Sequence, residues 1–375
     1  MMEYKLDNYL DALNKQVISM DQGLCYNPEF RASKKMHDYP SRKAQIIRSL
    51  YTGELEANEY NAEIIYKSIL SRQGERWQNF GESSEDYTDA LILGRNLIAE
   101  SGVIDKKISG LLDRIDENNG HLINIDKINL SKYLAHLPTK KDADLYLFID
   151  DQTLKYVPDS LDNLASFFKN KKMFFKNDII SHFPGWEYFA YGLIEKGREH
   201  LKKLVSELNA ENIKTVITLT GQSQYILEKF THKLGIKREF EVVNILELIN
   251  ELETEEDVFL YGGSFYSRYL DYGDKINSLL SSGDRNSNSL ENYPLYKSGP
   301  RINEVNIWEM PLRAEYELFF FPEEIANYIY NDSLNNIEKG IQDKIVIFDP
   351  YPFHELDKRN HQTEFVYFTE LIGTR

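Results

Sequence analysis

Few residues of this 375-residue sequence have the types and spacing that catalysis or metal binding needs. The single cysteine, Cys25, excludes an internal disulfide, a thiolate zinc site and an iron–sulfur cluster held by this chain's cysteines alone. An isolated cysteine is more often a small buried hydrophobe than a nucleophile. The sequence has no G-x-G-x-x-G after a strand, no phosphate loop G-x-x-x-x-G-K-[ST] and no H-E-x-x-H.

Two looser patterns each have a simpler interpretation. Gly262-Gly263-Ser264 follows an expected strand and could present backbone N–H groups to a phosphate, but a tight turn uses glycines in the same way. Asp349, His354, Asp357 and His361 offer oxygen and nitrogen ligands near a strand end, although clusters this loose are usually solvated surface. Neither pattern makes an enzyme by itself.

The composition is that of a folded protein with an acidic surface. Hydrophobic residues make up 42% and aromatic residues 13%, which excludes a disordered chain. The 60 acidic and 44 basic residues give a net charge of −16, which disfavours a nucleic-acid partner because phosphate binding needs a positive surface. No apolar run is long enough to span a membrane, and residues 1–9 lack the apolar stretch of a signal peptide. We expect a soluble, cytoplasmic protein of two or three domains.

The first third of the chain has a helical pattern with no convincing strand. Apolar residues recur at helical spacing in the segments 6–13, 46–51, 62–69 and 87–98. We therefore expect a small helical N-terminal domain over residues 1–130.

From Asp144 onward, short apolar runs alternate with amphipathic helices, which is typical of an α/β protein. The runs are 145–149, 215–219, 258–261 and 344–348, and a strong helix is expected over 193–208. Uninterrupted apolar runs indicate strands that are buried on both faces, and hence a largely parallel sheet.

The α/β part also contains an internal repeat. Asp144-Leu-Tyr-Leu-Phe resembles Asp257-Val-Phe-Leu-Tyr, and Lys214-Thr-Val-Ile-Thr resembles Lys344-Ile-Val-Ile-Phe. The segments 242–249 and 366–372 also match, each as a strand that leads into a final helix. The repeat predicts two similar α/β lobes, 144–252 and 257–375, with the Ser-, Asn- and Gly-rich stretch 281–300 as a surface insertion.

The order of segments over residues 17–373 resembles the iron–sulfur subunits of glycolate oxidase and anaerobic glycerol-3-phosphate dehydrogenase, and the heterodisulfide reductase subunits. Those proteins carry a helical domain with two ferredoxin-type cysteine motifs, followed by two cysteine-rich lobes with a Cys-Cys-Gly signature. Gly23-Leu24-Cys25 and Pro28-Glu29-Phe30-Arg31 match the first ferredoxin region, although two residues closer together, and would leave Cys25 as the one surviving ligand. Tyr39-Pro-Ser-Arg-Lys43 and Gly53-Glu-Leu55 resemble the segments that follow.

The resemblance implies that other residues occupy the remaining cysteine positions. In the second ferredoxin region, behind Tyr66, these are Ser68, Ser71, Gly74 and Gln78. In the first lobe, the strand-end cysteine falls on Asp151, Cys-Cys-Gly on Phe183-Pro184-Gly185, and C-P-x-C on the segment from Thr220 to Ser223. In the second lobe, the corresponding positions are Ser264, then Phe319-Phe320-Phe321, and then the segment from Asp349 to Pro352.

The residues at these cysteine positions determine which cofactors the chain could still bind. Iron in such clusters is held by thiolates, which serine, glycine, glutamine and phenylalanine cannot replace, so we expect no iron–sulfur cluster and no other cofactor. Phe183 and the phenylalanines at 319–321 would fill the vacated sites, since a fully buried ring gains roughly 1.5–3 kcal/mol. The aromatic residues Trp186, Tyr188, Phe189 and Tyr191 either complete this filling or pack in the core at a helix start.

The sequence thus predicts a cluster-free relative of an electron-transfer subunit, acting as a structural or regulatory partner in a redox complex. Its partner would be a flavin dehydrogenase or an intact paralogue. One alternative is an oxidoreductase subunit, of the heterodisulfide reductase or 2-hydroxy-acid/glycerol-3-phosphate dehydrogenase type, with a site rebuilt from non-cysteine ligands. Another is a small-molecule binding protein that uses the cleft between the lobes.

Overall fold

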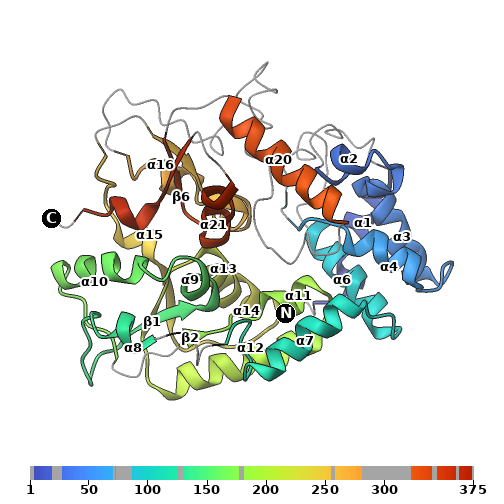
Figure 1. The fold of residues 1–375 in the computed structure, drawn as a ribbon. Helices are drawn as coiled ribbons and strands as arrows, with labels where there is room; N and C mark the ends of the chain where they lie inside the picture. The colour runs from blue at the N-terminus through green and yellow to red at the C-terminus, as the bar shows by residue number, and fades with distance from the viewer. Residues whose placement is uncertain are drawn as a thin grey trace.

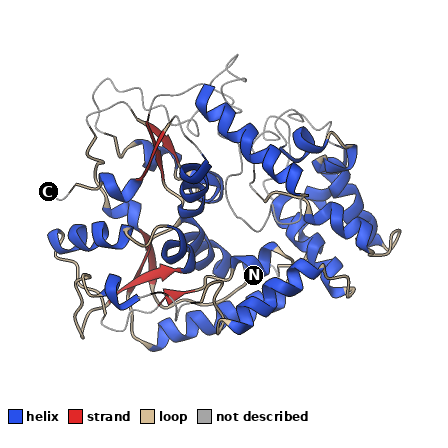
Figure 2. Cartoon of the chain, in the orientation of Figure 1, coloured by secondary structure: helices blue, strands red, loops and turns tan. Residues whose placement is uncertain are grey.

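The computed structural model of the chain describes residues 4–18, 28–70, 72, 87–124, 128, 130–176, 181–254, 258–280, 322–339, 344–359 and 363–373 (Figure 1). Over these residues the protein is mixed α/β, with a helical N-terminal part and two small parallel sheets (Figure 2). The α/β class expected from the sequence is therefore confirmed. The expected insertion at 281–300 and the phenylalanines at 319–321 lie outside the described residues.

The N-terminal part is built from helices. They are η1 (Leu6–Tyr9), α1 (Leu10–Ile18), α2 (Pro28–Ser33), η3 (Met36–Asp38), α3 (Pro40–Thr52), α4 (Glu59–Tyr66), α6 (Tyr87–Glu100), α7 (Lys106–Glu117) and α8 (Leu130–Leu134). Local signals set their ends: α3 begins with a proline and ends at Gly53 in the left-handed conformation, and Asn58 caps α4 together with Asn61. Each of the four segments with helical periodicity overlaps at least one of these helices.

The first α/β half contains a four-stranded parallel sheet. Its strands are β1 (Leu145–Asp150), β2 (Ser181–His182), β3 (Thr215–Thr218) and β4 (Glu241–Asn244), in the order β2-β1-β3-β4. The connecting helices are α9 (Asp151–Tyr156), α10 (Ser160–Asn170), α11 (Trp186–Ala190), α12 (Ile194–Ala210), α13 (Gly221–Gln224), the π-helical turn η5 (Tyr225–Phe230), α14 (Thr231–Lys233) and α15 (Ile245–Leu248). The strands expected at 145–149 and 215–219 and the helix expected at 193–208 are confirmed, whereas β2 was not predicted.

The second half contains a three-stranded parallel sheet. Its strands β5 (Phe259–Tyr261), β6 (Lys344–Ile347) and β7 (Glu364–Tyr367) pair in the order β5-β6-β7. The helical elements are η6 (Phe265–Tyr269), α16 (Gly273–Asn277), α20 (Glu323–Lys339), α21 (Pro350–Arg359) and η8 (Phe368–Leu371). The strands expected at 258–261 and 344–348 are confirmed.

The helices that follow the strands meet between the two sheets. Helix α9, which follows β1, contacts α21, which follows β6, and α13, which follows β3, contacts η6, which follows β5. Figure 2 shows the two sheets as separate groups of strands with helices between them. Helix α20 of the second half contacts α2, so the second half also reaches the N-terminal part (Figure 1).

A buried carboxylate joins the N-terminal part to the first half. Asp89 on α6 is 1% exposed and accepts hydrogen bonds from the Tyr4 hydroxyl at 2.8 Å and from the Lys233 ammonium on α14. Arg72 lies 3.5 Å from the same carboxylate. Burial alone would raise the pKa of Asp89, but the charges of Lys233 and Arg72 lower it below its usual value.

A second set of contacts holds α6 and α4 against the loop after α11. The Tyr66 hydroxyl donates to the carbonyl oxygen of Tyr191 at 3.1 Å, and the Asn96 side chain donates to the carbonyl oxygen of Gly192 at 2.9 Å. Gly192 has a φ of +76°, and a Cβ built on it would lie 2.4 Å from a backbone atom of Arg95. The loop therefore approaches the helix more closely than a side chain would allow.

Replacing this glycine is expected to break the contact. Gly192→Ala should lower the free energy of unfolding by about 3 kcal/mol, because it adds the strain of a left-handed alanine to a clash with backbone atoms. Gly102→Ala is the matched control, since Gly102 has a φ of +83° with no atom within 4 Å of the added Cβ. It should cost only about 1 kcal/mol. Urea unfolding followed by circular dichroism measures both, and equal losses would contradict the close approach.

Candidate functional site

Thr220 and Ser223, which the resemblance assigns to the C-P-x-C signature, lie at the carboxyl end of β3 and are joined by a carboxylate. Asp150, the last residue of β1, is 1% exposed, and its Oδ2 accepts hydrogen bonds from the hydroxyls of Thr220 at 2.5 Å and Ser223 at 2.6 Å. Its Oδ1 accepts from the backbone N–H of Thr153 at 2.8 Å, which caps α9. Thr220 in turn caps α13. The structure therefore brings Thr220 and Ser223 together around Asp150.

Asp151, the strand-end position of the sequence prediction, is held in a different set of contacts. Its Oδ1 lies 2.8 Å from Nδ1 of His121, and its Oδ2 accepts from the backbone N–H of Leu122 at 2.7 Å. Burial raises the pKa of this carboxyl although His121 and the N–H of Leu122 lower it. None of these partners is shared with Asp150, its neighbour in the chain.

The Cys-Cys-Gly positions of the first half follow β2, which pairs with β1. Phe183 is 2% exposed, and its ring contacts those of Tyr188 and His200 with centroids 5.5 and 5.2 Å away. His200 Nε2 lies 2.7 Å from the carbonyl oxygen of Phe183, and Pro184 is buried. Phe183 and Pro184 are therefore packed among core side chains, and the expectation that Phe183 fills a vacated cluster site stays a prediction.

The adjacent strand residue is a buried histidine. His182 is 6% exposed, its Nε2 lies 2.7 Å from the Tyr146 hydroxyl, and its ring stacks on Phe148 with centroids 4.5 Å apart. Burial, with smaller contributions from His121 and His200, lowers the pKa of His182 to about 3. The imidazole is therefore neutral over the physiological pH range.

In the second half, Ser264, Asp349 and Pro352 are buried at the carboxyl ends of β5 and β6. Ser264 Oγ accepts from Arg268 Nη1 at 3.1 Å. The Asp349 carboxylate lies directly on Gly263, because a Cβ built on that glycine, whose φ is +74°, would be 2.3 Å from Asp349 Oδ2. A glycine at this position gives the carboxylate its space.

A buried tyrosine connects the strand ends of the two halves. The Tyr266 hydroxyl on η6 donates to the carbonyl oxygen of Leu219, which follows β3, at 3.3 Å. Burial raises the pKa of Tyr266 well above its usual value, and the charges of Asp349 and Asp150 raise it further. The carboxylates of Asp150 and Asp349, one from each half, therefore both contribute to the raised pKa of Tyr266.

Near Ser68, in the predicted second ferredoxin region, a buried arginine donates hydrogen bonds to backbone carbonyl oxygens. Arg95 on α6 has no exposed surface, and its guanidinium donates to the carbonyl oxygens of Ser68 at 2.6 Å, Tyr66 at 3.2 Å and Ala190. Tyr66 ends α4 and Ala190 ends α11, so one guanidinium caps the carboxyl-terminal ends of two helices.

The next residues of the same loop are held by side chains from elsewhere. The Lys43 ammonium donates to the carbonyl oxygen of Lys67 at 2.8 Å, Glu29 Oε1 accepts from the N–H of Ile69 at 2.7 Å, and the Tyr269 hydroxyl donates to the carbonyl oxygen of Leu70 at 2.5 Å. Burial raises the pKa of Glu29 and lowers that of Lys43, while their mutual attraction at 3.7 Å opposes both shifts. Several backbone carbonyl and N–H groups of the segment 65–70 are thus hydrogen-bonded to side chains of this chain.

An aromatic cluster fills the junction of the three parts. Trp186 is 1% exposed and meets Phe265 and Tyr269 of the second half edge-on, with ring centroids 5.2 and 5.6 Å away. It also meets Tyr225 and Phe230 of the first half. Trp186 is the first residue of α11 and packs in the core at this helix start, whereas its role in filling a vacated metal site stays a prediction.

Several predicted positions lie outside the described residues, namely Cys25, Ser71, Gly74, Gln78, Phe319, Phe320 and Phe321. Within the described ranges, no three or more His, Cys, Asp or Glu side chains come together as a metal site would require. The loose cluster of Asp349, His354 and Asp357 gives no such group, and His361 is not described.

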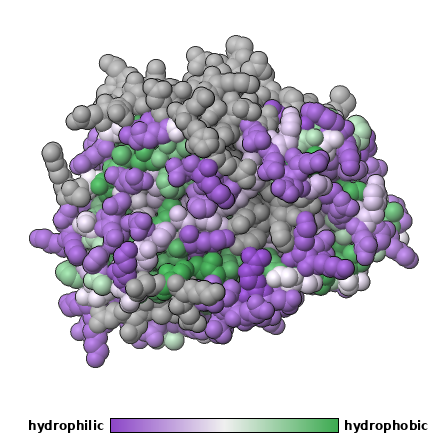
Figure 3. Space-filling view, viewed as in Figure 1, coloured by the Kyte–Doolittle hydropathy of each residue, from purple (hydrophilic) through white to green (hydrophobic). Residues whose placement is uncertain are grey.

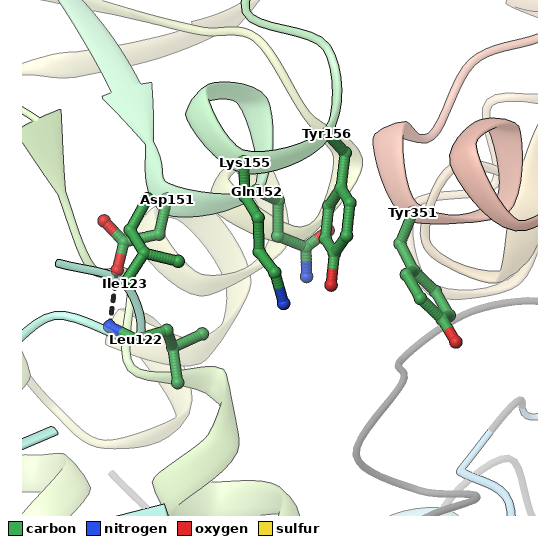
Figure 4. Close-up of a pocket in the computed structure, with 7 residues that line it drawn as sticks. All are labelled: Leu122, Ile123, Asp151, Gln152, Lys155, Tyr156 and Tyr351. Atoms are coloured by element: carbon green, nitrogen blue, oxygen red, sulfur yellow. Dashed lines mark hydrogen bonds between the residues drawn. The ribbon is translucent and has the colours of Figure 1, made fainter. Parts of the chain in front are cut away.

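A pocket opens beside Asp151 between the two halves (Figure 4). Leu122 and Ile123 line it from the segment after α7, and α9 contributes Asp151, Gln152, Lys155 and Tyr156, while Tyr351 comes from α21. The space beside these residues is about 250 Å³ when open solvent is included, but the pocket itself has room for only about one water molecule. Figure 3 shows that hydrophilic side chains cover most of the described surface in this view, with a hydrophobic patch near the part where Figure 1 draws α9.

Sequence reasoning missed Arg95, Asp150 and the Asp89–Lys233 pair. The usable signal for Arg95 was its place in α6, whose other residues from 90 to 98 are mostly apolar and buried. A charged residue in such a helix needs buried partners. Asp150 carried no separate signal beside Asp151.

Comparison of the chain with protein-family models, curated proteins and solved structures found no match. Over the described residues, no helix is long and apolar enough to cross a membrane.

Removing the Arg95 guanidinium is expected to separate the parts that it joins. Arg95→Met should lower the free energy of unfolding by about 4 kcal/mol, because it leaves buried carbonyl oxygens without donors. Arg114→Met, at an exposed position of α7, should change it by less than about 0.5 kcal/mol. Urea unfolding measures both; a loss of under about 1 kcal/mol for Arg95→Met would show that the carbonyl groups find other partners.

The buried His182 is expected to make stability fall in acid. The folded histidine stays neutral down to its pKa of about 3, whereas the unfolded chain takes up a proton below about 6.5. The unfolded state therefore binds more protons in this window, and about 2 kcal/mol should be lost between about pH 7 and about pH 5. Urea unfolding of parent and His182→Gln at both pH values should show that this loss is absent from the variant. His136→Gln, at an exposed site, should keep the parent's pH dependence, and an unchanged slope in His182→Gln would refute the assignment.

Proposed function

We propose that the protein is a cluster-free relative of iron–sulfur electron-transfer subunits, acting as a structural or regulatory partner in a redox complex. The observation that carries the proposal is the closure of the strand-end site in the first half. Two residues at implied cysteine positions, Thr220 and Ser223, bond the same Asp150 carboxylate. Their hydroxyls and the buried carboxylate satisfy one another, so this edge of the sheet is stable without iron.

The arrangement of the halves supports the proposed descent from a two-lobed protein. The strands β1, β3 and β4 are parallel and adjacent in that order, as are β5, β6 and β7. The repeat places Asp150 opposite Gly263, and the C-P-x-C positions place Thr220 opposite Asp349. The pair Asp150 and Thr220 in the first half therefore corresponds to the pair Gly263 and Asp349 in the second. Each pair holds one carboxylate, which follows the first strand in one half and the second strand in the other. The superposition of the two lobes stays a prediction, as does the degenerate ferredoxin-type nature of residues 1–130.

The N-terminal part offers contacts for a partner. Five of the seven exposed large hydrophobic side chains in the described part of the chain belong to its helices and loops: Met36, Tyr51, Leu55, Tyr60 and Ile104. Apolar side chains in water favour protein contacts. We propose a flavin dehydrogenase or an intact iron–sulfur paralogue as the protein that covers them.

One observation favours the rival proposal, an oxidoreductase subunit with a rebuilt site. Asp151, at an implied cysteine position, pairs with His121 beside the pocket. An aspartate and a histidine are both able to bind metals or move protons. Redox titration of the purified protein separates the proposals, since a structural partner has no group that takes up electrons.

Iron analysis tests the main proposal directly. Protein purified under anaerobic conditions should be colourless and hold no stoichiometric iron or acid-labile sulfide, because one cysteine cannot replace the several thiolates that a cluster needs. Co-expression with a flavin dehydrogenase or iron–sulfur subunit from the same genome, followed by gel filtration, should yield a complex. About four irons per purified chain would refute the cluster-free assignment, and failure to co-elute with any such subunit would refute the partner role.

A further inference from the structure

A basic surface lies around the turn that follows α10. Its lysines are all exposed, and they are Lys140, Lys141, Lys169, Lys171 and Lys172. The whole chain carries −16, so this surface is opposite in sign to the protein as a whole. Figure 1 draws α10 at the edge of the molecule, away from the helices α1 to α4 of the N-terminal part.

Two segments of the chain bring these lysines together. Three of the lysines lie at or just after the carboxyl-terminal end of α10, where the partial negative charge of the helix favours cations. Lys140 and Lys141 come from the segment before β1. That segment runs beside Phe175, because the N–H of Lys140 donates to the carbonyl oxygen of Phe175 at 2.7 Å and the N–H of Phe175 donates to that of Pro138 at 2.9 Å. The helix end therefore accounts for three of the lysines, and the other segment adds two more to the same surface.

The acidic side chains closest to this surface in the fold are paired with other lysines. Glu211 pairs with Lys176, and Asp144 pairs with Lys214, which leaves the exposed Asp142. In the described part of the chain, no carboxylate lies within ion-pair distance of the five lysines. The Lys171 ammonium lies 5.6 Å from the ring centroid of Phe167, a contact that does not neutralise its charge. The surface therefore presents positive charge to an outside anion.

An aromatic side chain projects from the same turn. Phe174 is 49% exposed, and the residues on both sides of it are fixed by the backbone. The N–H of Met173 donates to the carbonyl oxygen of Phe168 at 3.0 Å, and the N–H of Lys176 donates to that of Leu145 at 2.9 Å. The ring of the next residue, at 175, is buried, so the alternation of side chains along extended backbone directs Phe174 outward.

An outward aromatic ring among lysines matches the surface of an anionic bilayer. Anionic headgroups attract lysines close to the membrane, and an apolar ring enters the boundary between the headgroups and the acyl chains. A protein partner needs a broad complementary face, with apolar side chains at its centre. Among the described residues of the first half, Phe174 is the one strongly exposed large hydrophobic side chain, so no broad apolar face surrounds it.

We propose that the turn after α10 binds the surface of an anionic membrane. The five lysines lie against the headgroups, and Phe174 enters the boundary below them. The exposed hydrophobic side chains of α3 and α4 lie away from α10 (Figure 1), so a partner protein on the N-terminal part and a membrane at α10 occupy different surfaces. The proposal does not rest on the structural-partner role, and the two can fail independently.

Cosedimentation of the full-length protein with lipid vesicles tests the proposal. With about 30 mol% phosphatidylserine in phosphatidylcholine, half of the protein should bind at about 1 mM lipid. Vesicles of phosphatidylcholine alone should bind at least about tenfold more weakly, and raising the salt to about 0.5 M should release the protein because the charges are then screened. No binding at about 10 mM of the anionic lipid mixture, or equal binding to both kinds of vesicle, would overturn the proposal.

Charge variants locate the binding on the protein. Lys141→Gln combined with Lys172→Gln should weaken binding to the anionic vesicles at least about tenfold, because two of the five charges are lost. Lys106→Gln combined with Lys203→Gln makes the same change of net charge at exposed positions of α7 and α12, and it should leave binding unchanged. An equal loss in both double variants would mean that the vesicles respond only to overall charge, and the surface would be rejected.

Variants of the aromatic residue test its insertion. Phe174→Ser should weaken binding at least about fivefold, whereas Tyr60→Ser, at a 68% exposed aromatic residue of α4, should not change it. Phe174→Trp should keep binding, and the fluorescence that it adds should shift to shorter wavelength when anionic vesicles are present. Circular dichroism checks that each variant is folded. The absence of this shift, or displacement of the vesicles by poly-glutamate with no effect of Phe174→Ser, would assign the surface to acidic polypeptides and overturn the lipid proposal.

Discussion

The guanidinium of Arg95 is the contact on which the arrangement of the protein depends. It lies in the interior and donates to carbonyl oxygens at the ends of α4 and α11, which belong to different parts of the chain. The carbonyl ends of helices carry partial negative charge, so a single cation stabilises both at once. The close approach at Gly192 makes the geometry possible, because a side chain there would push the loop away from α6. Packing of the aromatic junction then follows from the position that α11 is given.

Buried side chains near the strand ends meet through groups of different chemistry. Around Trp186 the packing between the halves is aromatic, whereas the predicted filling at residues 319–321 lies outside the described residues. At Thr220 and Ser223 the packing is polar, with a buried carboxylate that takes both hydroxyls. Both arrangements are buried, but the polar one depends on complete pairing, because a buried carboxylate without donors is costly.

The sequence predicted the strands of both sheets because burial on two faces produces continuous apolar runs, as at 145–149 and 344–348. It did not predict β2, since two residues have no measurable periodicity. At the candidate site it selected Asp151, whereas the carboxylate that joins Thr220 and Ser223 is that of Asp150. Successive side chains at a strand end point in opposite directions, so a shift of one residue changes every partner. Arg95 was missed because its partners are backbone carbonyls, which leave no pattern in the sequence.

The hydrogen bonds of the segment 65–70 also have a consequence for folding during translation. Glu29 and Lys43 are synthesised before this segment, and Arg95 soon after it; all three hydrogen-bond its backbone. The fourth partner, Tyr269, follows almost two hundred residues later. A chain emerging from the ribosome therefore carries this loop incompletely bonded until the second half has been translated and docked. Of the contacts of this segment, the one with Tyr269 closes the largest loop in sequence, and the entropy lost in closing a loop grows with its length. A nascent chain that stops before η6 leaves the carbonyl oxygen of Leu70 without its tyrosine donor.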